Sequence, residues 1–435
     1  MGAFEIRGGN KLSGTITAQG AKNEALQVLC AVLLTNEAIT FHNVPDILDV
    51  NTLIDLLEDM GITITRRGAN ALTLQATNVN TEYFSDPSFK KKSGRMRGAV
   101  MLAGPMLARF KSAHIPQPGG DKIGRRRLDT HIRGFEKLGV KFDYDTDQSL
   151  FTLDGGNMQG TEILLAEPSV TGTANIVMAA VLTQGITHIY NAACEPYVQQ
   201  LCRLLNKMGA NIAGIGSNLL KIEGVEALHG AEHTMLADMI EVGSFIGMAA
   251  ITHSELTIKN ASVEHLGIIP DTFRSLGIEM NIVGDDIHIP AQEQYNIQKF
   301  IDGSILTIYD HPWPGFTPDL LSIVLVTAIQ ANGTVLVHQK MFESRLFFVD
   351  KLIEMGAQIV LCDPHRAVVI GLDREATLRG ITMTSPDIRA GVALLIAALS
   401  AKGKSTIHNI EQIDRGYERI DERLAALGAD IKRID

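Results

Sequence analysis

A five-residue pattern recurs six times along the chain and marks the corners of its predicted elements. Each copy has Leu or Met, then Gly, then alternating apolar positions, and the glycines lie 68 to 79 residues apart. The copies are MGITI (60–64), LGVKF (138–142), MGANI (208–212), LGIEM (276–280), MGAQI (355–359) and LGADI (427–431). Glycine directly after a helix supplies a left-handed residue, and alternation is typical of a strand. Since an amphipathic stretch precedes each glycine, the pattern predicts six helix–Gly–strand corners.

Six further segments are apolar on nearly every side, which predicts helices that are buried on every side. They span 23–34, 97–110, 173–182, 241–251, 319–329 and 387–399. Short strands that end in polar turns are predicted after five of them, at 39–43, 186–191, 256–260, 335–339 and 405–409. Buried helices next to amphipathic ones indicate an α/β architecture with helices inside and sheets outside.

Six units of this kind are more natural as two domains of three units than as one continuous array. The segment 229–238 follows the third unit and precedes the fourth. We therefore expect one domain over 22–237 and a second formed by 1–21 together with 238–435. The segment Phe4–Ile16 is predicted as a strand that pairs with the second domain.

Composition places the chain among globular proteins, with 45% hydrophobic and 20% charged residues in 435. The formal charge of −10 hides a local excess of twelve Lys and Arg over three Asp between Asp86 and Arg133. An acidic protein with one basic segment is suited to a small anion rather than to nucleic acid or an anionic membrane. Four scattered cysteines without a CxxC motif, and a first segment without an apolar stretch, predict a cytoplasmic protein with free thiols.

Charged residues gather where the buried helices are predicted to begin. Helix N-termini expose unpaired N–H groups and hold anions, so Lys22 beside Asn23 is a candidate anion site. A solvated lysine with an asparagine cap fits this segment equally well. Likewise, Asp319 and Asp387 are either functional carboxylates or N-caps of their helices.

Two other segments suggest recognition of phosphate. PGGDKIGRRRLDTH (118–131) combines glycines with three consecutive arginines, whose forked side chains match phosphate oxygens. A solvated basic loop is the alternative, and the scarcity of aromatic residues argues against nucleic acid. In IDRGYERIDER (413–423), Arg415 and Arg419 lie four residues apart beside Asp414 and Glu418, so ion pairing within a helix is an alternative to ligand binding.

Six motifs, in this order over essentially the whole chain, resemble those of the enolpyruvyl transferases. They are GAKN (20–23), PGGDKIGRR (118–126), PDLL (318–321), FESR (342–345), PDIRAG (386–391) and DRGYER (414–419). The resemblance implies an inside-out α/β barrel fold of two domains, each with three repeated βαβαββ units and buried helices, and an active site in the cleft between the domains.

The same resemblance implies a reaction. The enolpyruvyl group of phosphoenolpyruvate (PEP) would pass to the 3′-hydroxyl of UDP-N-acetylglucosamine, with release of phosphate, by addition and elimination. This is the first committed step of peptidoglycan synthesis, and it needs neither a metal nor an organic cofactor. Neither nucleic acid nor a membrane is expected as a partner, and a monomer is expected.

Residue roles follow from the matching motif positions. Asp121 would be the general acid and Asp319 the general base. Lys22, Arg126 and Arg415 would bind PEP, with Asn23 near the reacting centre. The UDP-sugar would contact Arg97, Met341 and the run Arg126, Arg127, Leu128, Asp129 and Thr130. Arg345 is assigned to substrate binding, and Asp387 and Arg389 are expected to help order the closed cleft.

The sequence departs from the commoner family pattern at three positions. Asp121 stands where many members have a reactive Cys, and Leu48 and Pro168 stand where relatives often have basic residues. A carboxylate is a poorer nucleophile than a thiolate toward epoxides, so we expect resistance to fosfomycin. Because neighbouring cations favour the ionised form of Asp121, we hypothesise that bound PEP raises the pKa of Asp121 only in the closed complex.

Two alternatives to this function belong to different classes. The sister transferase that acts on shikimate 3-phosphate would also need a basic cleft, although GAKN, the glycine-rich loop and DRGYER fit the sugar-nucleotide enzyme better. A non-catalytic protein that senses a UDP-sugar is the other alternative. It would not need the acid Asp121 and the base Asp319 together.

Overall fold

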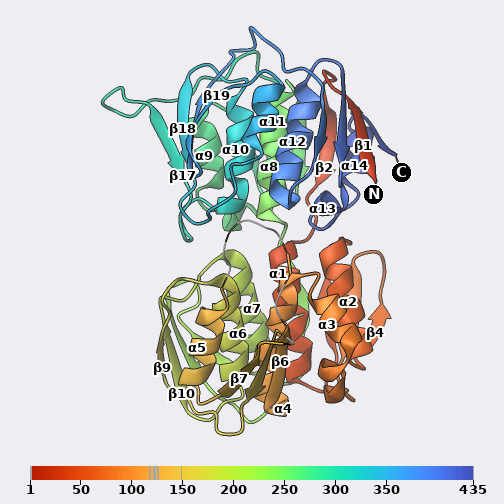
Figure 1. The fold of residues 1–435 in the computed structure, drawn as a ribbon, viewed down its shortest axis with the longest axis vertical. Helices are drawn as coiled ribbons and strands as arrows, with labels where there is room; N and C mark the ends of the chain where they lie inside the picture. The colour runs from red at the N-terminus through yellow and green to blue at the C-terminus, as the bar shows by residue number, and fades with distance from the viewer. Residues whose placement is uncertain (1, 117–118, 121–123, 125–126, 148, 435) are drawn as a thin grey trace. The chain divides into compact units, whose positions relative to one another are not determined.

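The structure, a computed structural model, describes residues 2–116, 119–120, 124, 127–147 and 149–434. The chain forms two compact units (Figure 1). The terminal unit contains the N-terminal segment up to Gln19 and the chain from Ala237 onwards. The central unit begins at Gly20 and ends at Leu236.

Helices and strands alternate through the central unit. Its α-helices are α1 (Lys22–Val28), α2 (Leu48–Asp59), α3 (Pro87–Ser93), α4 (Ala103–Phe110), α5 (Asp129–Lys137), α6 (Val170–Ala180) and α7 (Pro196–Lys207), and its 3-10 helices are η1 (Cys30–Leu34), η2 (Thr81–Ser85) and η3 (Arg97–Leu102). Its strands are β3 (Ile39–His42), β4 (Thr63–Arg66), β5 (Ala71–Gln75), β6 (Ser112–Pro116), β7 (Lys141–Asp145), β8 (Leu150–Asp154), β9 (Glu162–Leu164), β10 (Ile186–Tyr190), β11 (Asn211–Ala213), β12 (Leu219–Glu223) and β13 (Glu232–Thr234).

The terminal unit has the same alternation. Its helices are α8 (Met239–Ile251), η4 (Val263–His265), α9 (Ile269–Ser275), η5 (Pro318–Leu320), α10 (Leu321–Ala328), α11 (Val349–Glu354), α12 (Ile388–Ser400), α13 (Glu411–Asp414) and α14 (Ile420–Ala426). Its strands are β1 (Ala3–Arg7), β2 (Ser13–Thr17), β14 (Glu255–Lys259), β15 (Asn281–Val283), β16 (Asp286–Ile289), β17 (Leu306–Tyr309), β18 (Thr334–His338), β19 (Gln358–Asp363), β20 (Arg366–Ile370), β21 (Thr382–Thr384), β22 (Lys404–His408) and β23 (Asp430–Ile434).

Five sheets within the described residues share one plan, and this plan reflects the sequence repeat. Each of these sheets has four strands. In the orders given below, the first and second strands are parallel, and the second and third and the third and fourth are antiparallel. The orders are β13-β3-β5-β4, β9-β10-β12-β11, β2-β14-β16-β15, β17-β18-β20-β19 and β21-β22-β1-β23. The sheet β6-β8-β7 has three antiparallel strands.

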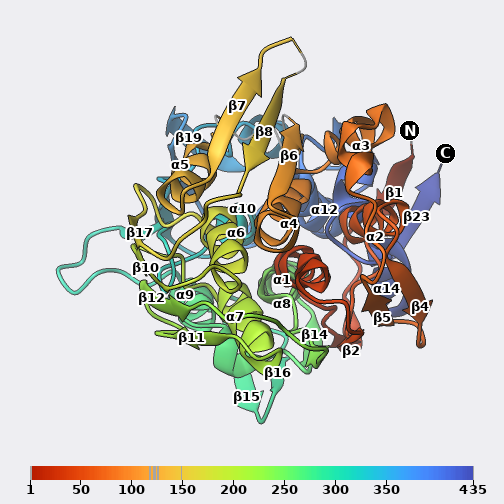
Figure 2. The same cartoon turned by 90° about the horizontal axis from the view of Figure 1, so that it is seen from below.

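The predicted buried helices are confirmed in both units. Every residue of α8 and α10 is buried, as is all of α12 except its last residue. These three helices contact one another between the sheets of the terminal unit (Figure 1). In the central unit α1, α4 and α6 lie in the middle, with strands around them (Figure 2). Helices that are apolar all round can be stable only where every face is packed.

The predicted corners are also confirmed. The six repeat glycines, Gly61, Gly139, Gly209, Gly277, Gly356 and Gly428, all have φ between 88° and 107°. This is the left-handed region, in which a side chain would be strained. Asparagines at the ends of four predicted strands also have positive φ, namely Asn43, Asn191, Asn260 and Asn409.

One expectation was wrong in its detail. Phe4–Ile16 is not one strand, because Gly9 has a φ of 92° and separates β1 from β2. Both strands nevertheless join sheets of the terminal unit, as predicted. β1 lies between β22 and β23, while β2 pairs in parallel with β14. In the described part of the chain, no helix is long and apolar enough to span a membrane.

Candidate functional site

The starts of α8 and α12 are capped by aspartates. The Asp387 carboxylate accepts hydrogen bonds from the backbone N–H groups of Arg389 at 2.8 Å and Ala390 at 3.0 Å. The Asp238 carboxylate accepts one from the N–H of Ile240 at 2.8 Å. Each aspartate satisfies backbone donors that have no partner within the helix. The capping alternative is therefore confirmed for Asp387.

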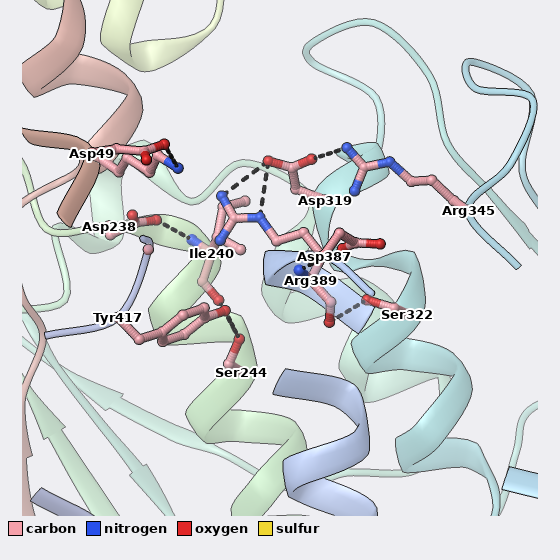
Figure 3. Close-up of polar contacts among 12 residues, drawn as sticks. Asp49, Asp238, Ile240, Ser244, Asp319, Ser322, Arg345, Asp387, Arg389 and Tyr417 are labelled. Carbon is pink, nitrogen blue, oxygen red and sulfur yellow. Dashed lines mark hydrogen bonds and ion pairs between the residues drawn. The ribbon is translucent and has the colours of Figure 1, made fainter. Parts of the chain in front are cut away.

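Asp319 precedes α10 but does not cap it. One carboxylate oxygen, Oδ1, accepts a hydrogen bond from Arg345 Nη2 at 2.6 Å. The other, Oδ2, accepts from Arg389 Nη2 at 3.0 Å and Nε at 3.2 Å. Figure 3 shows both guanidinium groups pointing at this carboxylate. We call Asp319, Arg345 and Arg389 the Asp319 cluster.

The Asp319 cluster assembles residues from three separate parts of the terminal unit. Asp319 lies in η5, Arg389 is the second residue of α12, and Arg345 lies between β18 and α11. The side chain of Asp319 is 19% exposed, that of Arg389 is 7% exposed and that of Arg345 is 11% exposed. Because a guanidinium only donates hydrogen bonds, both oxygens of Asp319 act as acceptors, which is the form that a general base needs.

Aromatic rings and a serine fix the two arginines. The guanidinium carbon of Arg345 lies 4.6 Å from the ring centroid of Phe342, and that of Arg389 lies 5.9 Å from the ring centroid of Tyr417. The carbonyl of Arg389 accepts a hydrogen bond from Ser322 at 3.2 Å. Arg345 Nε is buried and has no hydrogen-bond partner among the described residues.

The DRGYER segment makes some of the ion pairs that its spacing allowed, and it also pairs with a distant strand. Arg415 donates to Gln412 at 2.8 Å, and the Asp414 carboxylate instead binds Arg433 on β23 at 2.7 Å and 2.8 Å. Arg419 is 3.6 Å from both Glu418 and Glu422 and is largely exposed. Ion pairing within this segment, the alternative to ligand binding, is therefore present for Arg419, while Asp414 pairs with Arg433.

Tyr417, which the sequence did not single out, is buried between Ser244 on α8 and the guanidinium of Arg389. Its hydroxyl lies 2.8 Å from Ser244 Oγ on α8 (Figure 3). Burial raises the pKa of Tyr417 to about 12, so the ring stays neutral beneath Arg389. The presence of an aromatic residue inside the polar DRGYER motif was the sequence signal that could have identified Tyr417.

In the central unit, the start of α1 carries a buried ion pair. Lys22 is the first residue of α1, and its Nζ lies 2.7 Å from Asp49 Oδ2 on α2. The two side chains are only 7% and 8% exposed. The cap position of α1 is Ala21, and no side chain caps the helix. The alternative of a solvated lysine with an asparagine cap is therefore wrong, and Asp49 is a partner that the motif did not reveal.

The same helix is fixed by a second buried contact. Glu24 is fully buried, and its Oε1 lies 2.7 Å from His233 Nε2 on β13. Its other oxygen accepts the N–H of Leu236 at 3.1 Å. This contact ties the first turn of α1 to the end of β13, so Lys22 and Asn23 begin a rigid element.

A third group of predicted residues meets at η3 and α5. Arg97 begins η3 and donates to the carbonyl of Arg127 at 3.2 Å. Leu128 precedes α5, Asp129 begins it, and Thr130 donates to Glu167 at 3.1 Å. The structure thus brings Arg97 and the run 127–130 together. Asp121 and Arg126 lie outside the described residues.

His131 is a buried residue next to this run that sequence reasoning missed. Its Nδ1 lies 2.9 Å from the Asn175 side chain and its Nε2 lies 3.0 Å from Thr171 Oγ1. Burial, with a smaller effect of the Arg97 charge, lowers the pKa of His131 to about 3. The imidazole is therefore neutral, and it connects α5 to α6.

The remaining predicted positions are more exposed or peripheral. Met341 is 38% exposed, and its backbone N–H donates to the buried Asp310 carboxylate at 3.1 Å. Leu48 is the exposed first residue of α2, and Pro168 precedes Ser169, the cap of α6. Cys30 and Cys202 are buried, and burial raises the pKa of both thiols. Within the described residues, no group of His, Cys, Asp or Glu has the geometry to hold a metal ion.

Comparison with solved structures shows which folds this arrangement matches. The enolpyruvyl transferase NikO from Streptomyces tendae superposes with a TM-score of 0.87 at 21% identity, over 99% of this chain and 98% of that chain. EPSP synthase from Acinetobacter baumannii gives a TM-score of 0.75 at 16% identity, over 100% of both chains. At these identities the comparison shows a common two-domain α/β fold.

Sequence comparison reaches much higher identities. UDP-N-acetylglucosamine 1-carboxyvinyltransferase from Bacteroides fragilis is 64% identical over 434 residues, which cover 100% of both proteins. The protein of the same name from Porphyromonas gingivalis is 62% identical over the same length. The family model for EPSP synthase (3-phosphoshikimate 1-carboxyvinyltransferase) matches residues 6–424. With the fold and the Asp319 cluster in place, these matches establish that the chain belongs to the EPSP synthase family of enolpyruvyl transferases.

Proposed function

We propose that this protein transfers the enolpyruvyl group of PEP to the 3′-hydroxyl of UDP-N-acetylglucosamine, with release of phosphate. The transfer would be the first committed step of peptidoglycan synthesis. The observation that carries the choice of acceptor is full-length identity of 62–64% to relatives named for that substrate. The Asp319 cluster supports the chemistry, because it presents an ionised carboxylate between two fixed cations.

The reaction needs a balanced pair of proton transfers. In the addition step, an acid protonates the methylene carbon of PEP while the sugar hydroxyl loses its proton to a base and its oxygen attacks the adjacent carbon. In the elimination step, the new methyl group loses a proton and the C–O bond to phosphate breaks, so the double bond is restored. We assign the base to Asp319 and the acid to Asp121, since general acid–base catalysis requires positioned groups of both kinds.

Cations would bind the charged parts of the substrates. We assign PEP to Lys22, Arg126 and Arg415, with Asn23 beside the reacting carbon. Arg345 is a further candidate for an anionic oxygen, because its buried Nε lacks a partner among the described residues. Bidentate guanidinium contacts match carboxylate and phosphate oxygens well.

The UDP-sugar would contact a different set of residues. We assign it to Arg97, to the run 126–130 and to Met341, with Asp387 and Arg389 ordering the site. Contact of Arg97 with the Arg127 carbonyl supports this grouping. The arrangement of each unit as an inside-out barrel, and an active site in the cleft between the domains, are parts of the same proposal.

The deciding experiment measures phosphate release from PEP with each of two acceptors. We expect release with UDP-N-acetylglucosamine and none with shikimate 3-phosphate. Release only with shikimate 3-phosphate would instead favour the EPSP synthase activity, for which the family model is described. If neither acceptor supports release while UDP-N-acetylglucosamine still binds in calorimetry, a non-catalytic sensor of the sugar nucleotide remains.

The assignment of Asp121 has its own test, with fosfomycin as the probe. We expect the unmodified protein to keep its activity during incubation with fosfomycin, because a carboxylate is a poor nucleophile toward an epoxide. Asp121→Cys should become sensitive, and mass spectrometry should find the adduct on that residue. Inactivation of the unmodified protein at the rate of Asp121→Cys would contradict the assignment.

A further inference from the structure

Gln19 joins two backbone groups of the DRGYER segment. It follows β2 and is the last residue of the terminal unit before the chain enters the central unit. Its side chain is buried. The amide Nε2 donates to the carbonyl of Gly416 at 2.8 Å, and Oε1 accepts the N–H of Glu418 at 2.7 Å. A single side chain therefore fixes the peptide groups on both sides of Tyr417.

The segment that Gln19 fixes lies against the start of α12. A Cβ atom on Gly416 would come within 2.6 Å of Ile388 Cγ2, so the backbone approaches the helix too closely for any side chain. Tyr417 lies between Ser244 and the guanidinium of Arg389. Because Arg389 binds Asp319, the position of residues 416–418 influences the orientation of the Asp319 cluster.

Gln19 is itself held on both sides of its backbone. Its N–H donates to Glu241 Oε2 at 2.7 Å, and its carbonyl accepts the N–H of Asp238 at 2.8 Å. Glu241 is buried and pairs with Arg423 at 2.5 Å and 3.1 Å. Arg423 also donates to the carbonyl of Glu418 at 3.3 Å. Gln19 is thus part of a packed polar network, and such networks hold one geometry when every member is satisfied.

We propose that Gln19 is a positioning residue for catalysis, which fixes residues 416–418 and thereby orients Arg415 and Arg389. This inference rests on the proposed function, because it assigns Gln19 to the residues that would hold PEP and the base. Gln19 does not touch the reacting atoms. Its effect is exerted through peptide groups, and small displacements of catalytic groups are costly to the rate.

The test uses Gln19→Met, which keeps the side-chain length and removes both hydrogen bonds. Gln292→Met is a matched control, because Gln292 makes the same kind of bridge. Its Nε2 donates to the Gly277 carbonyl at 3.1 Å, and its Oε1 accepts the Glu279 N–H at 2.7 Å. We expect Gln19→Met to lower kcat/KM for PEP by about tenfold, and Gln292→Met to leave it unchanged. The KM for UDP-N-acetylglucosamine should change little in either variant.

Comparable kinetics in the two variants would overturn the inference, provided that the unmodified enzyme releases phosphate. Absence of release by the unmodified enzyme would instead contradict the proposed function.

A second variant keeps the inference testable if Gln19→Met fails to fold. In Gln19→Glu an ionised carboxylate cannot donate to Gly416, whereas a protonated one can. Burial beside the Glu241 carboxylate should raise the pKa of a glutamate at position 19, so the activity of Gln19→Glu relative to the unmodified enzyme should rise as the pH falls from about 8 to about 5. A constant ratio over this range would contradict the role of the Gly416 hydrogen bond.

Discussion

The starts of α10 and α1 balance their buried charges in different ways. At α10, one carboxylate, Asp319, binds two guanidinium groups, so these three side chains carry two positive charges and one negative. At α1, one ammonium, Lys22, binds one carboxylate, Asp49, and these two charges cancel. Both groupings are largely withdrawn from water, so electrostatic interactions within them are strong.

The difference teaches how each region can respond to an anionic substrate. An excess of positive charge can be compensated by an anion while the base keeps at least one cationic partner. Since Lys22 is ion-paired with Asp49, a substrate that binds Lys22 must share that cation with Asp49. We therefore expect substitutions at Asp319 to affect chemistry first, and substitutions at Lys22 to affect stability as well as binding.

Loss of the Asp319 carboxylate should have the largest effect. Asp319→Asn keeps the size of the side chain but cannot accept a proton, so we expect kcat to fall by about 10²-fold or more. The rate of phosphate release at saturating PEP and UDP-N-acetylglucosamine gives this kcat. Asp302→Asn, which alters an exposed loop aspartate that accepts hydrogen bonds from Ser304, is the control and should retain kcat. A kcat for Asp319→Asn within a few-fold of normal would exclude Asp319 as the base.

Breaking the Lys22–Asp49 pair should cost stability as well as activity. Lys22→Gln leaves the Asp49 carboxylate buried without its cation, and we expect the free energy of unfolding to drop by about 3 kcal/mol. The double variant Lys22→Gln with Asp49→Asn removes both charges and should recover most of that loss without recovering activity. Urea denaturation gives the stabilities. If the double variant is as unstable as the single one, the pair is not the source of the cost.

The two arginines of the Asp319 cluster should differ in their tolerance of lysine. Arg389 uses two nitrogens on Asp319 Oδ2, whereas Arg345 makes a single hydrogen bond to Oδ1, and both guanidinium groups lie over an aromatic ring. Lysine can replace a single bond but not a two-point contact. We expect kcat/KM to fall about tenfold more in Arg389→Lys than in Arg345→Lys. Equal losses in steady-state assays would mean that the contact geometry does not set the difference.

The smallest effect should come from the aspartate that caps a helix. Asp387→Ala removes two hydrogen bonds to backbone N–H groups of α12 and should reduce the free energy of unfolding by about 1 kcal/mol. Asn also caps well, so Asp387→Asn should cost only a few tenths of that amount. Urea denaturation of both variants separates them. A loss in Asp387→Asn as large as in Asp387→Ala would show that the charge, and not the cap, stabilises this position.

Much of the fold could be predicted because its signals are local. The helix–Gly–strand corners depend on one residue type that tolerates positive φ, and all six glycines show it. The all-apolar segments predicted buried helices because such helices need packing on every face. The break between β1 and β2 was missed although GGN lies there, since alternation on both sides resembled one long strand.

The candidate site was predictable in its members but not in their contacts. The motifs named Asp319, Arg345 and Arg389, yet these residues are separated by up to 70 positions along the chain, and only packing joins them. Spacing also did not reveal that Asp414 binds Arg433, which lies 19 positions further along the chain. Gln19 and Asp49 have no motif signal, since their importance comes from what they touch, and Tyr417 lies inside the DRGYER motif without being singled out by it.

The sequence by itself determined the repeated unit, the buried helices, the family and the residue types available for acid–base chemistry and anion binding. Only the tertiary structure decided that Asp387 caps its helix while Asp319 binds two arginines, and that Lys22 is buried against Asp49. The physical reason is that periodicity and turn preference act between near neighbours in the chain. The partner of a charged side chain depends on which distant elements share its buried surroundings.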